Sequence, residues 1–140
     1  MKILEILTEK RQIGTIGEIA AAKHLKKSRY KILRKNYVAL GHEIDIIAED
    51  KDAVVFVEVK TRTIGKQNDD EPRPASAVTP EKQRKIISTA KFFLGSRPPS
   101  KKIRFDIIEV YLDETKTVQS LCHIESAFNY NTAHPHRFNN

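Results

Sequence analysis

The apolar positions of the chain predict one central strand and several flanking ones. Residues 53–61 carry apolar side chains on both faces at their start, which is typical of a strand buried inside a sheet. Three further runs have the length and the residue types of strands, namely 30–39, 43–50 and 103–112. A short last element covers 118–128, and the pattern leaves its type open.

Two segments follow helical spacing instead. The first covers residues 8–28, and the second begins at Thr79 and Pro80 and ends near Gly95. Threonine is a good N-cap, and proline is favoured at the first helical position. The expected order is therefore α-β-β-β-α-β, an α/β fold with a mixed central sheet flanked by helices.

The length and composition suit one domain. A chain of 140 residues with 39% hydrophobic residues can bury one core, which we expect over residues 1–128. Residues 62–78 have the prolines and acidic residues of a loop. The Asn- and His-rich residues 129–140 have little to bury, so we expect a loosely ordered tail there.

The same composition excludes several classes of protein. The lone cysteine, Cys122, permits no internal disulfide and no multi-cysteine zinc site, and we expect it to be a small core residue in a cytoplasmic protein. No apolar run approaches the roughly 18–20 residues of a membrane helix, and the N-terminus does not have the pattern of a signal peptide. The histidines are scattered, which argues against a zinc site.

The charge has a pattern along the chain. The net charge is +7, and residues 1–40 and 71–105 each carry a balance of +7, whereas residues 41–70 carry −4. Carboxylates repel phosphates, so a protein that only coats nucleic acid gains little from an acidic centre. A metal-dependent enzyme that acts on phosphodiesters uses basic residues to hold the phosphate backbone and acidic residues to hold the metal. Accidental clustering of charges on a solvated surface would give the same numbers.

Ionisable residues interrupt the two central strands. Asp45 and Glu58 lie on strands joined by a tight turn, and Lys60 follows Glu58 on the same face. One interpretation is an ion pair of Lys60 with either acid at a water-exposed strand end. The other is a site for Mg²⁺ or Mn²⁺ held by Asp45, Glu58 and the backbone carbonyl of Val59, with Lys60 orienting the attacking water.

Other residues can extend such a site. Glu18 shares a helical face with the small residues Gly14, Gly17 and Ala21, so it points at the site or reaches solvent at the edge of that face.

Lys82 and Gln83, near a helix N-terminus, can reach a phosphate, and Arg62 is a further candidate for nucleic-acid binding; Lys82 is at least as readily a surface lysine. Asp106 could act as an outer carboxylate, but an ion pair with Arg104 is the better interpretation.

These residues together resemble the YraN family of uncharacterised bacterial proteins, over roughly residues 11–128. The matching segments are Gly14-x-x-Gly17-Glu18-x-x-Ala21, Tyr30–Leu33 with Asn36, Glu43–Ala48, Phe56–Arg62, Ala77-Val78 with Lys82-Gln83, Arg104–Ile108 and His123–Phe128. That family is similar to the PD-(D/E)xK nuclease superfamily, and most of all to archaeal Holliday-junction resolvases. The resemblance implies a restriction-endonuclease-like core.

The resemblance also implies roles for single residues. Asp45 matches the first acidic position, Glu58 the second and Lys60 the lysine. Glu18 matches a helix-borne carboxylate, and the pair at 82 and 83 matches polar residues that some members use. Two departures are Ile44 in place of proline before Asp45, and His42 where many members of the family have glycine.

The sequence therefore favours a Mg²⁺-dependent endonuclease that acts on DNA, with branched or damaged DNA as candidate substrates. Branched substrates and paired cuts would favour a homodimer, although the sequence shows no dimer surface. Two alternatives stay open at this point. One is a catalytically inactive nucleic-acid-binding module on the same fold, and the other is a basic protein that binds an acidic protein partner.

Overall fold

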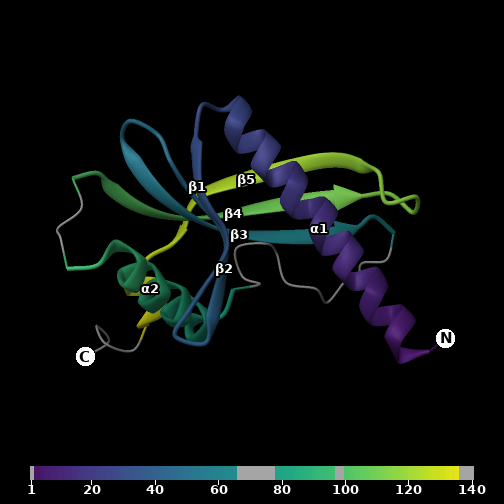
Figure 1. Cartoon of the computed structure of the whole chain (residues 1–140), viewed down its shortest axis with the longest axis horizontal. Coiled ribbons are helices and arrows are strands. Elements are labelled where there is room, and N and C mark those ends of the chain that lie inside the picture. The colour runs from purple at the N-terminus through teal and green to yellow at the C-terminus, as the bar shows by residue number, and fades with distance from the viewer. Residues whose placement is uncertain (1, 66–77, 97–99, 136–140) are drawn as a thin grey trace.

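Five strands form one sheet with helices on both of its faces (Figure 1). The computed structural model describes residues 2–65, 78–96 and 100–135. Neighbours in the sheet are also neighbours in sequence, in the order β1-β2-β3-β4-β5. In chain order the elements are α1 (Ile3–Lys27), β1 (Lys31–Ala39), β2 (His42–Glu49), β3 (Ala53–Thr63), α2 (Pro80–Leu94), β4 (Lys102–Leu112), β5 (Val118–Phe128) and α3 (Tyr130–Ala133).

The sheet is mixed, as the sequence predicted. The β1–β2, β2–β3 and β4–β5 pairs are antiparallel, whereas β3 and β4 run parallel. Parallel neighbours need a crossover connection, and the segment between them contains α2. The α/β class with a mixed sheet flanked by helices is thus confirmed, and the element left open at 118–128 is the edge strand β5.

Strands β2 and β3 separate before they end. Their hydrogen-bonded pairing stops at Ile46 and Val57. Beyond that pair β2 remains paired with β1, whereas β3 remains paired with β4 as far as Thr63. Figure 1 shows β2 turning away from β3 at this point, which we call the fork. Asp45 and Glu58 are the first residues past the last pair, one on each branch of the fork.

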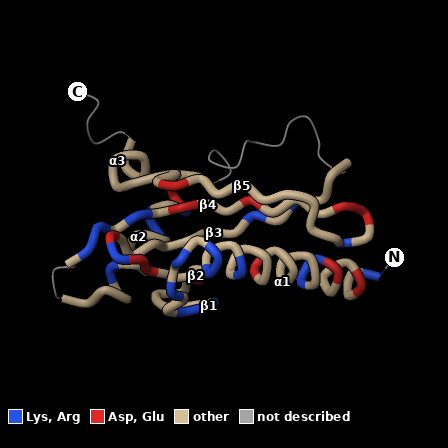
Figure 2. Tube along the Cα trace, turned by 90° about the horizontal axis from the view of Figure 1, so that it is seen from above, with Lys and Arg blue, Asp and Glu red and all other residues tan. Residues whose placement is uncertain are grey.

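Each face of the sheet carries its own core. Helix α1 covers one face with Ala21 and Leu25, which are fully buried against β2, β3 and β4. Helix α2 covers the other face with Ile86 and Ala90, next to Phe56 of β3. Figure 2 shows α1 and α3 on opposite sides of the sheet. Because both faces are covered, residues 53–58 of β3 are all buried, which explains their nearly continuous apolar pattern.

The predicted small-residue face of α1 packs closely on β3. A Cβ atom built on Gly17 would lie 1.8 Å from Oγ1 of Thr61, so only glycine permits this approach. Gly14 has nothing within 4 Å of such an atom, so the close contact is local to Gly17. The neighbouring residue Glu18 is thereby held beside the fork.

Several boundaries differ from the sequence prediction. Helix α1 begins at Ile3, not at residue 8, because nothing in residues 3–7 breaks a helix; Ile3 and Leu4 are left exposed there. Part of the expected loose tail is ordered, since Asn129 caps α3 and Ala133 is buried. Residues 66–77 of the expected loop lie outside the described residues.

The prediction for Cys122 was wrong. This residue is exposed on the edge strand β5 and does not belong to either core. Most residues of β5 are exposed or only partly buried, as expected of a strand at the edge of a sheet, so an apolar residue at position 122 gains little burial. No helix in the described ranges is long and apolar enough to span a membrane.

Candidate active site

The fork opens a cavity of about 430 Å³ between α1 and the two strands. Beyond the last backbone pair of β2 and β3, side chains occupy the space between the two strands. The residues that line the cavity come from α1, from β2 and from the second half of β3: Lys10, Ile13, Gly14, Glu18, Asp45, Glu58, Val59, Lys60, Thr61 and Thr63. Four predicted site residues therefore share one cavity, namely Glu18, Asp45, Glu58 and Lys60.

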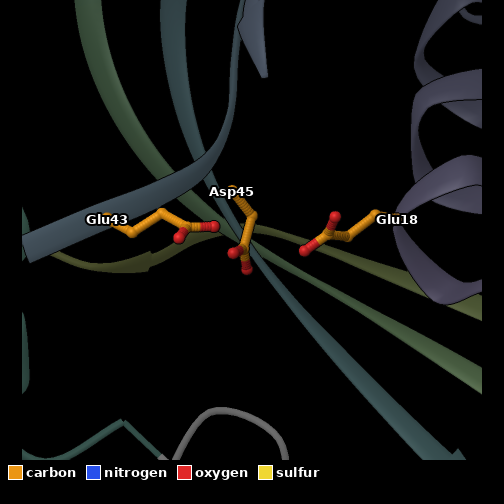
Figure 3. Close-up of side chains that lie close together, drawn as sticks. All are labelled: Glu18, Glu43 and Asp45. Carbon is orange, nitrogen blue, oxygen red and sulfur yellow. The ribbon is translucent and has the colours of Figure 1, made fainter. Parts of the chain in front are cut away.

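Three carboxylates converge at the fork. Glu18, Glu43 and Asp45 each offer an oxygen, and these oxygens lie within 4.8 Å of one another (Figure 3). The side chain of Asn36 joins two of them, because its Nδ2 donates to Glu18 at 3.2 Å and to Glu43 at 2.8 Å. A single amide group thus offsets part of the repulsion between the two glutamates.

Asp45 lies in an environment that strongly perturbs its pKa. Its carboxylate accepts one hydrogen bond, from the backbone amide of Val59 at 2.8 Å, across the open branch of the fork. Burial and then the charge of Glu58 raise the pKa of Asp45 from 3.8 to about 7, against the opposing effect of the Val59 bond. The carboxylates of Glu18 and Glu43 raise this pKa further. The fork therefore crowds several carboxylates together, and their mutual repulsion disfavours the charged form of Asp45.

Glu58 has cationic partners instead. Its Oε1 accepts a hydrogen bond from Nζ of Lys82 at 2.7 Å and lies 3.6 Å from Nζ of Lys60. Burial lowers the pKa of Lys60, against the attraction of Glu58 and with the help of the nearby Lys82. Burial also acts to lower the pKa of Lys82, but the bond to Glu58 outweighs it and leaves that pKa raised. The predicted pairing of Lys60 with Glu58 is therefore present, and α2 adds a second lysine to it.

The other two residues predicted to bind nucleic acid, Arg62 and Gln83, do not line the cavity. Arg62 donates to the fully buried Glu109 of β4 at 3.3 Å. Gln83 is buried, and its amide donates to the carbonyl of Val78 and accepts from the hydroxyl of Thr132. Gln83 thus holds the start of α2 to α3, and it does not line the cavity.

Sequence reasoning missed Glu43 and Asn36 as members of the site. A signal for Glu43 existed, because it stands two positions before Asp45 on β2 and alternate residues of a strand share a face. Asn36 reaches the site from β1, where its φ of 50° is a left-handed conformation that asparagine adopts more readily than most residues. Nothing in the strand pattern predicts that local conformation.

Asp106 belongs to a separate network. Its carboxylate accepts hydrogen bonds from Arg104 at 2.9 Å, from His123 at 2.7 Å and from the amide of Ser126 at 3.0 Å. Burial acts to raise the pKa of Asp106, but these bonds outweigh it and leave the pKa below 3.8. The predicted ion pair with Arg104 is confirmed, and Asp106 does not line the cavity at the fork.

The arrangement at the fork suits a hard divalent cation. Carboxylate oxygens are the preferred ligands of Mg²⁺ and Mn²⁺. Two oxygens on opposite sides of one Mg²⁺ are about 4.2 Å apart, so a spread of 4.8 Å requires only a small adjustment. The fold and the site together define a mixed α/β protein with a crowded acidic cavity where two strands of its sheet part, and with lysines at the cavity's edge.

Comparison with known proteins places the chain in a family. Residues 17–110 match the model of uncharacterised protein family UPF0102, and the chain belongs to that family. The matched range includes every residue of the cavity from Gly17 onward, but not the first turns of α1.

Curated relatives agree over most of the chain. The UPF0102 protein of Caldanaerobacter subterraneus subsp. tengcongensis is 44% identical, over 85% of this chain and 96% of its own length. The UPF0102 protein of Clostridium acetobutylicum is 41% identical, over 84% of this chain and 94% of its own. The UPF0102 protein of Chlorobaculum parvum is 43% identical, over 83% of this chain and 91% of its own.

Proposed function

We propose that this protein is a divalent-metal-dependent endonuclease that hydrolyses phosphodiester bonds of DNA. The observation that carries the proposal is the cavity at the fork, where Glu18, Asp45 and Glu58 line one space together with Lys60. The resemblance of the sequence to the PD-(D/E)xK nucleases supports the same activity, since Asp45, Glu58 and Lys60 match that motif.

The side chains at the fork divide the work in this proposal. Glu18, Asp45 and Glu58 would hold Mg²⁺ or Mn²⁺, together with the carbonyl of Val59. Such an ion, when bound, polarises a phosphate and makes a bound water more acidic. The partly buried ammonium of Lys60 would orient the attacking water and offset the charge that develops on the phosphate.

Lys82 has a further part. Its ammonium is bonded to Glu58 and offsets the charge of that carboxylate. Were Glu58 to hold a divalent ion, Lys82 could contact the phosphate from the side of α2.

The same ion pair favours a second candidate function. A Glu58–Lys82 bond of 2.7 Å is a sufficient structural role for both residues, as expected of a nucleic-acid-binding module that has no catalytic activity. Such a module would bind DNA in a salt-dependent manner, and its binding would not respond to changes at Asp45 or Glu58.

Cleavage assays separate the two candidates. Linear, flapped and four-way-junction DNAs are incubated with Mg²⁺ or Mn²⁺ and the wild-type protein, Asp45→Asn, Glu58→Gln or Lys60→Met. Each substitution removes several kcal/mol of transition-state stabilisation, so we expect the cleavage rate of each variant to be at least about 100-fold lower than that of wild type. Glu49→Gln is the matched control, because Glu49 lies on β2, as Asp45 does, and pairs with Lys101 away from the cavity.

Two results would overturn the nuclease proposal. One is equal residual cutting by wild type and all three variants, which indicates a contaminating enzyme. The other is the absence of cutting with DNA binding that is the same in wild type and in Asp45→Asn, which is the behaviour of the binding module. A homodimer and a preference for branched DNA remain predictions that the same panel of substrates addresses.

A further inference from the structure

A second cavity lies next to the fork, on the outer side of α2. Its volume is about 320 Å³, and it is bounded by α2 and by the turn between β1 and β2. The lining residues are Leu40, His42, Glu81, Arg84, Lys85, Ser88 and Thr89. Two cations and the hydroxyl of Ser88 therefore face a space large enough for a small anion, and Glu81 is the one acid among the lining residues.

The spacing along α2 explains why these groups share one cavity. Residues 81, 84, 85 and 88 stand at i, i+3, i+4 and i+7, so they occupy one face of the helix. The face is fixed at both ends. Thr89 is fully buried, and its hydroxyl lies 3.0 Å from the carbonyl of Lys85 and 3.3 Å from that of Ala39 at the end of β1, so it shapes the cavity wall and has no hydrogen left for a ligand. Arg84 donates one N–H to the carbonyl of Ala133 at 2.8 Å, and a guanidinium has four more to offer.

The second cavity is within electrostatic reach of the first. His42 lines the second cavity, and its pKa is lowered by burial, against the charge of Glu58 at the fork and with the help of Lys82 and Lys85. Lys82 and Lys85 are three residues apart on α2, which puts their Cβ atoms about 5–6 Å from each other. One turn of helix thus carries Lys82, which is bonded to Glu58 at the fork, and Lys85, which lines the second cavity.

We propose that the cavity formed by His42, Arg84, Lys85, Ser88 and Thr89 binds the backbone phosphate adjacent to the one that is cut. This inference rests on the proposed function, and it gives α2 the task of holding the DNA strand in register beside the fork. Arginine and lysine with nearby hydroxyls are the groups that hold phosphates in protein–DNA interfaces, and such contacts position the strand without reading its sequence. Glu81 opposes that binding, since it pairs with Lys85 at 3.6 Å.

The test measures the binding of a fluorescein-labelled 20-base-pair duplex by anisotropy, without divalent ions, across a series of salt concentrations. The proteins are wild type, Lys85→Gln, Arg84→Gln and Glu81→Gln, with Lys26→Gln as control. Lys26 is an exposed lysine of α1, on the opposite face of the sheet. Losing one phosphate contact lowers the slope of log affinity against log salt by about 1.

We expect that loss for Lys85→Gln and for Arg84→Gln, and none for Lys26→Gln. Glu81→Gln should instead bind at least as tightly as wild type, because it removes an acid and releases Lys85. Lys85 is largely exposed, so its substitution keeps the result interpretable even where Arg84→Gln weakens the contact with α3. Replacing single phosphates by neutral methylphosphonates then locates the contact: the substitution beside the cut should weaken wild type but not weaken Lys85→Gln further.

The outcomes distinguish this inference from the function on which it rests. If wild type neither binds nor cuts DNA, the proposed function fails and the phosphate site fails with it. If wild type binds and cuts, but Lys85→Gln and Arg84→Gln keep the wild-type salt slope, only the phosphate site is overturned. A thermal shift with inorganic phosphate that Lys85→Gln abolishes, together with an unchanged duplex slope, would assign the cavity to a free anion and overturn the proposal as well.

Discussion

Asp45 and Asp106 are two aspartates of the same sheet with opposite environments. Asp106 is fully buried and accepts hydrogen bonds from Arg104, His123 and Ser126, so it stays charged at a lower pKa than usual. Asp45 accepts a single backbone bond and faces other acids, and its pKa is about 7. A buried carboxylate with several hydrogen-bond donors supports the fold, whereas one that is crowded by other acids beside a cavity opposes folding in its charged form.

The two environments predict opposite effects of the same substitution. Asp106→Asn leaves Arg104 and His123 without their anion and should lower the free energy of unfolding by about 3 kcal/mol at pH 7. Because the pKa of Asp106 is lowered in the fold, its contribution exists above pH 3.8 and is lost as the pH falls below that value. Urea unfolding at several pH values measures this. An equal loss at pH 7 and at pH 3 would contradict the assigned network.

The position of α1 links the two environments, since it supplies Glu18 to the fork and His24 to the network around Asp106. Gly17→Ala should cost about 1–3 kcal/mol, because the added methyl group would overlap the Thr61 side chain and push the helix off β3. Gly14→Ala is the control. It meets no atom and should stabilise the helix by about 1 kcal/mol. Equal effects of the two substitutions in thermal unfolding would refute the close approach at Gly17.

The opposite effect is expected at Asp45. Its raised pKa means that the ionised carboxylate opposes folding increasingly as the pH rises from 3.8 through about 7. Without divalent ions, Asp45→Asn should therefore match wild type at pH 4 and be more stable than wild type at pH 8, by up to about 4 kcal/mol, since one unit of pKa corresponds to about 1.4 kcal/mol. Urea unfolding in the presence of a chelator checks this. If Asp45→Asn is instead less stable than wild type at pH 8, the carboxylate of Asp45 stabilises the fold as that of Asp106 does.

Divalent ions should reverse that last difference. Adding 10 mM MgCl₂ or MnCl₂ is expected to raise the melting temperature of wild type, because a ligand that binds only the folded state stabilises it, by about 2.7 kcal/mol at a hundred times its dissociation constant. The variant Asp45→Asn should show little or no shift. Equal shifts in both proteins would show that the ions act elsewhere on the surface.

The sequence predicted much of the site because strand geometry is regular. Alternation along β3 put Glu58 and Lys60 on one face, and the tight turn before it brought Asp45 opposite to them. Helical spacing put Glu18 on the small-residue face of α1. These inferences needed only the periods of regular elements, and the shared cavity agrees with them.

The other features of the site depend on contacts between separate elements, and the periodicity within one helix or strand does not predict such contacts. The bond from Lys82 to Glu58 joins α2 to β3 over 24 positions of sequence. Gln83 stands beside Lys82 yet points into the protein, because consecutive helical residues face different directions. The type of the last element, β5, could not be predicted either, since few residues of this edge strand are buried and its hydrophobic pattern is weak.

The fork also gives the site one stiff side and one compliant side. Glu58 and Lys60 stand on a strand that stays tied along its length to β4. Asp45 stands on the branch that has left that ladder, and its carboxylate is tethered across the gap by a single bond to Val59. The separation of the opposing acids can therefore be adjusted by bending the β1–β2 hairpin, while the paired strands β3 and β4 keep their shape.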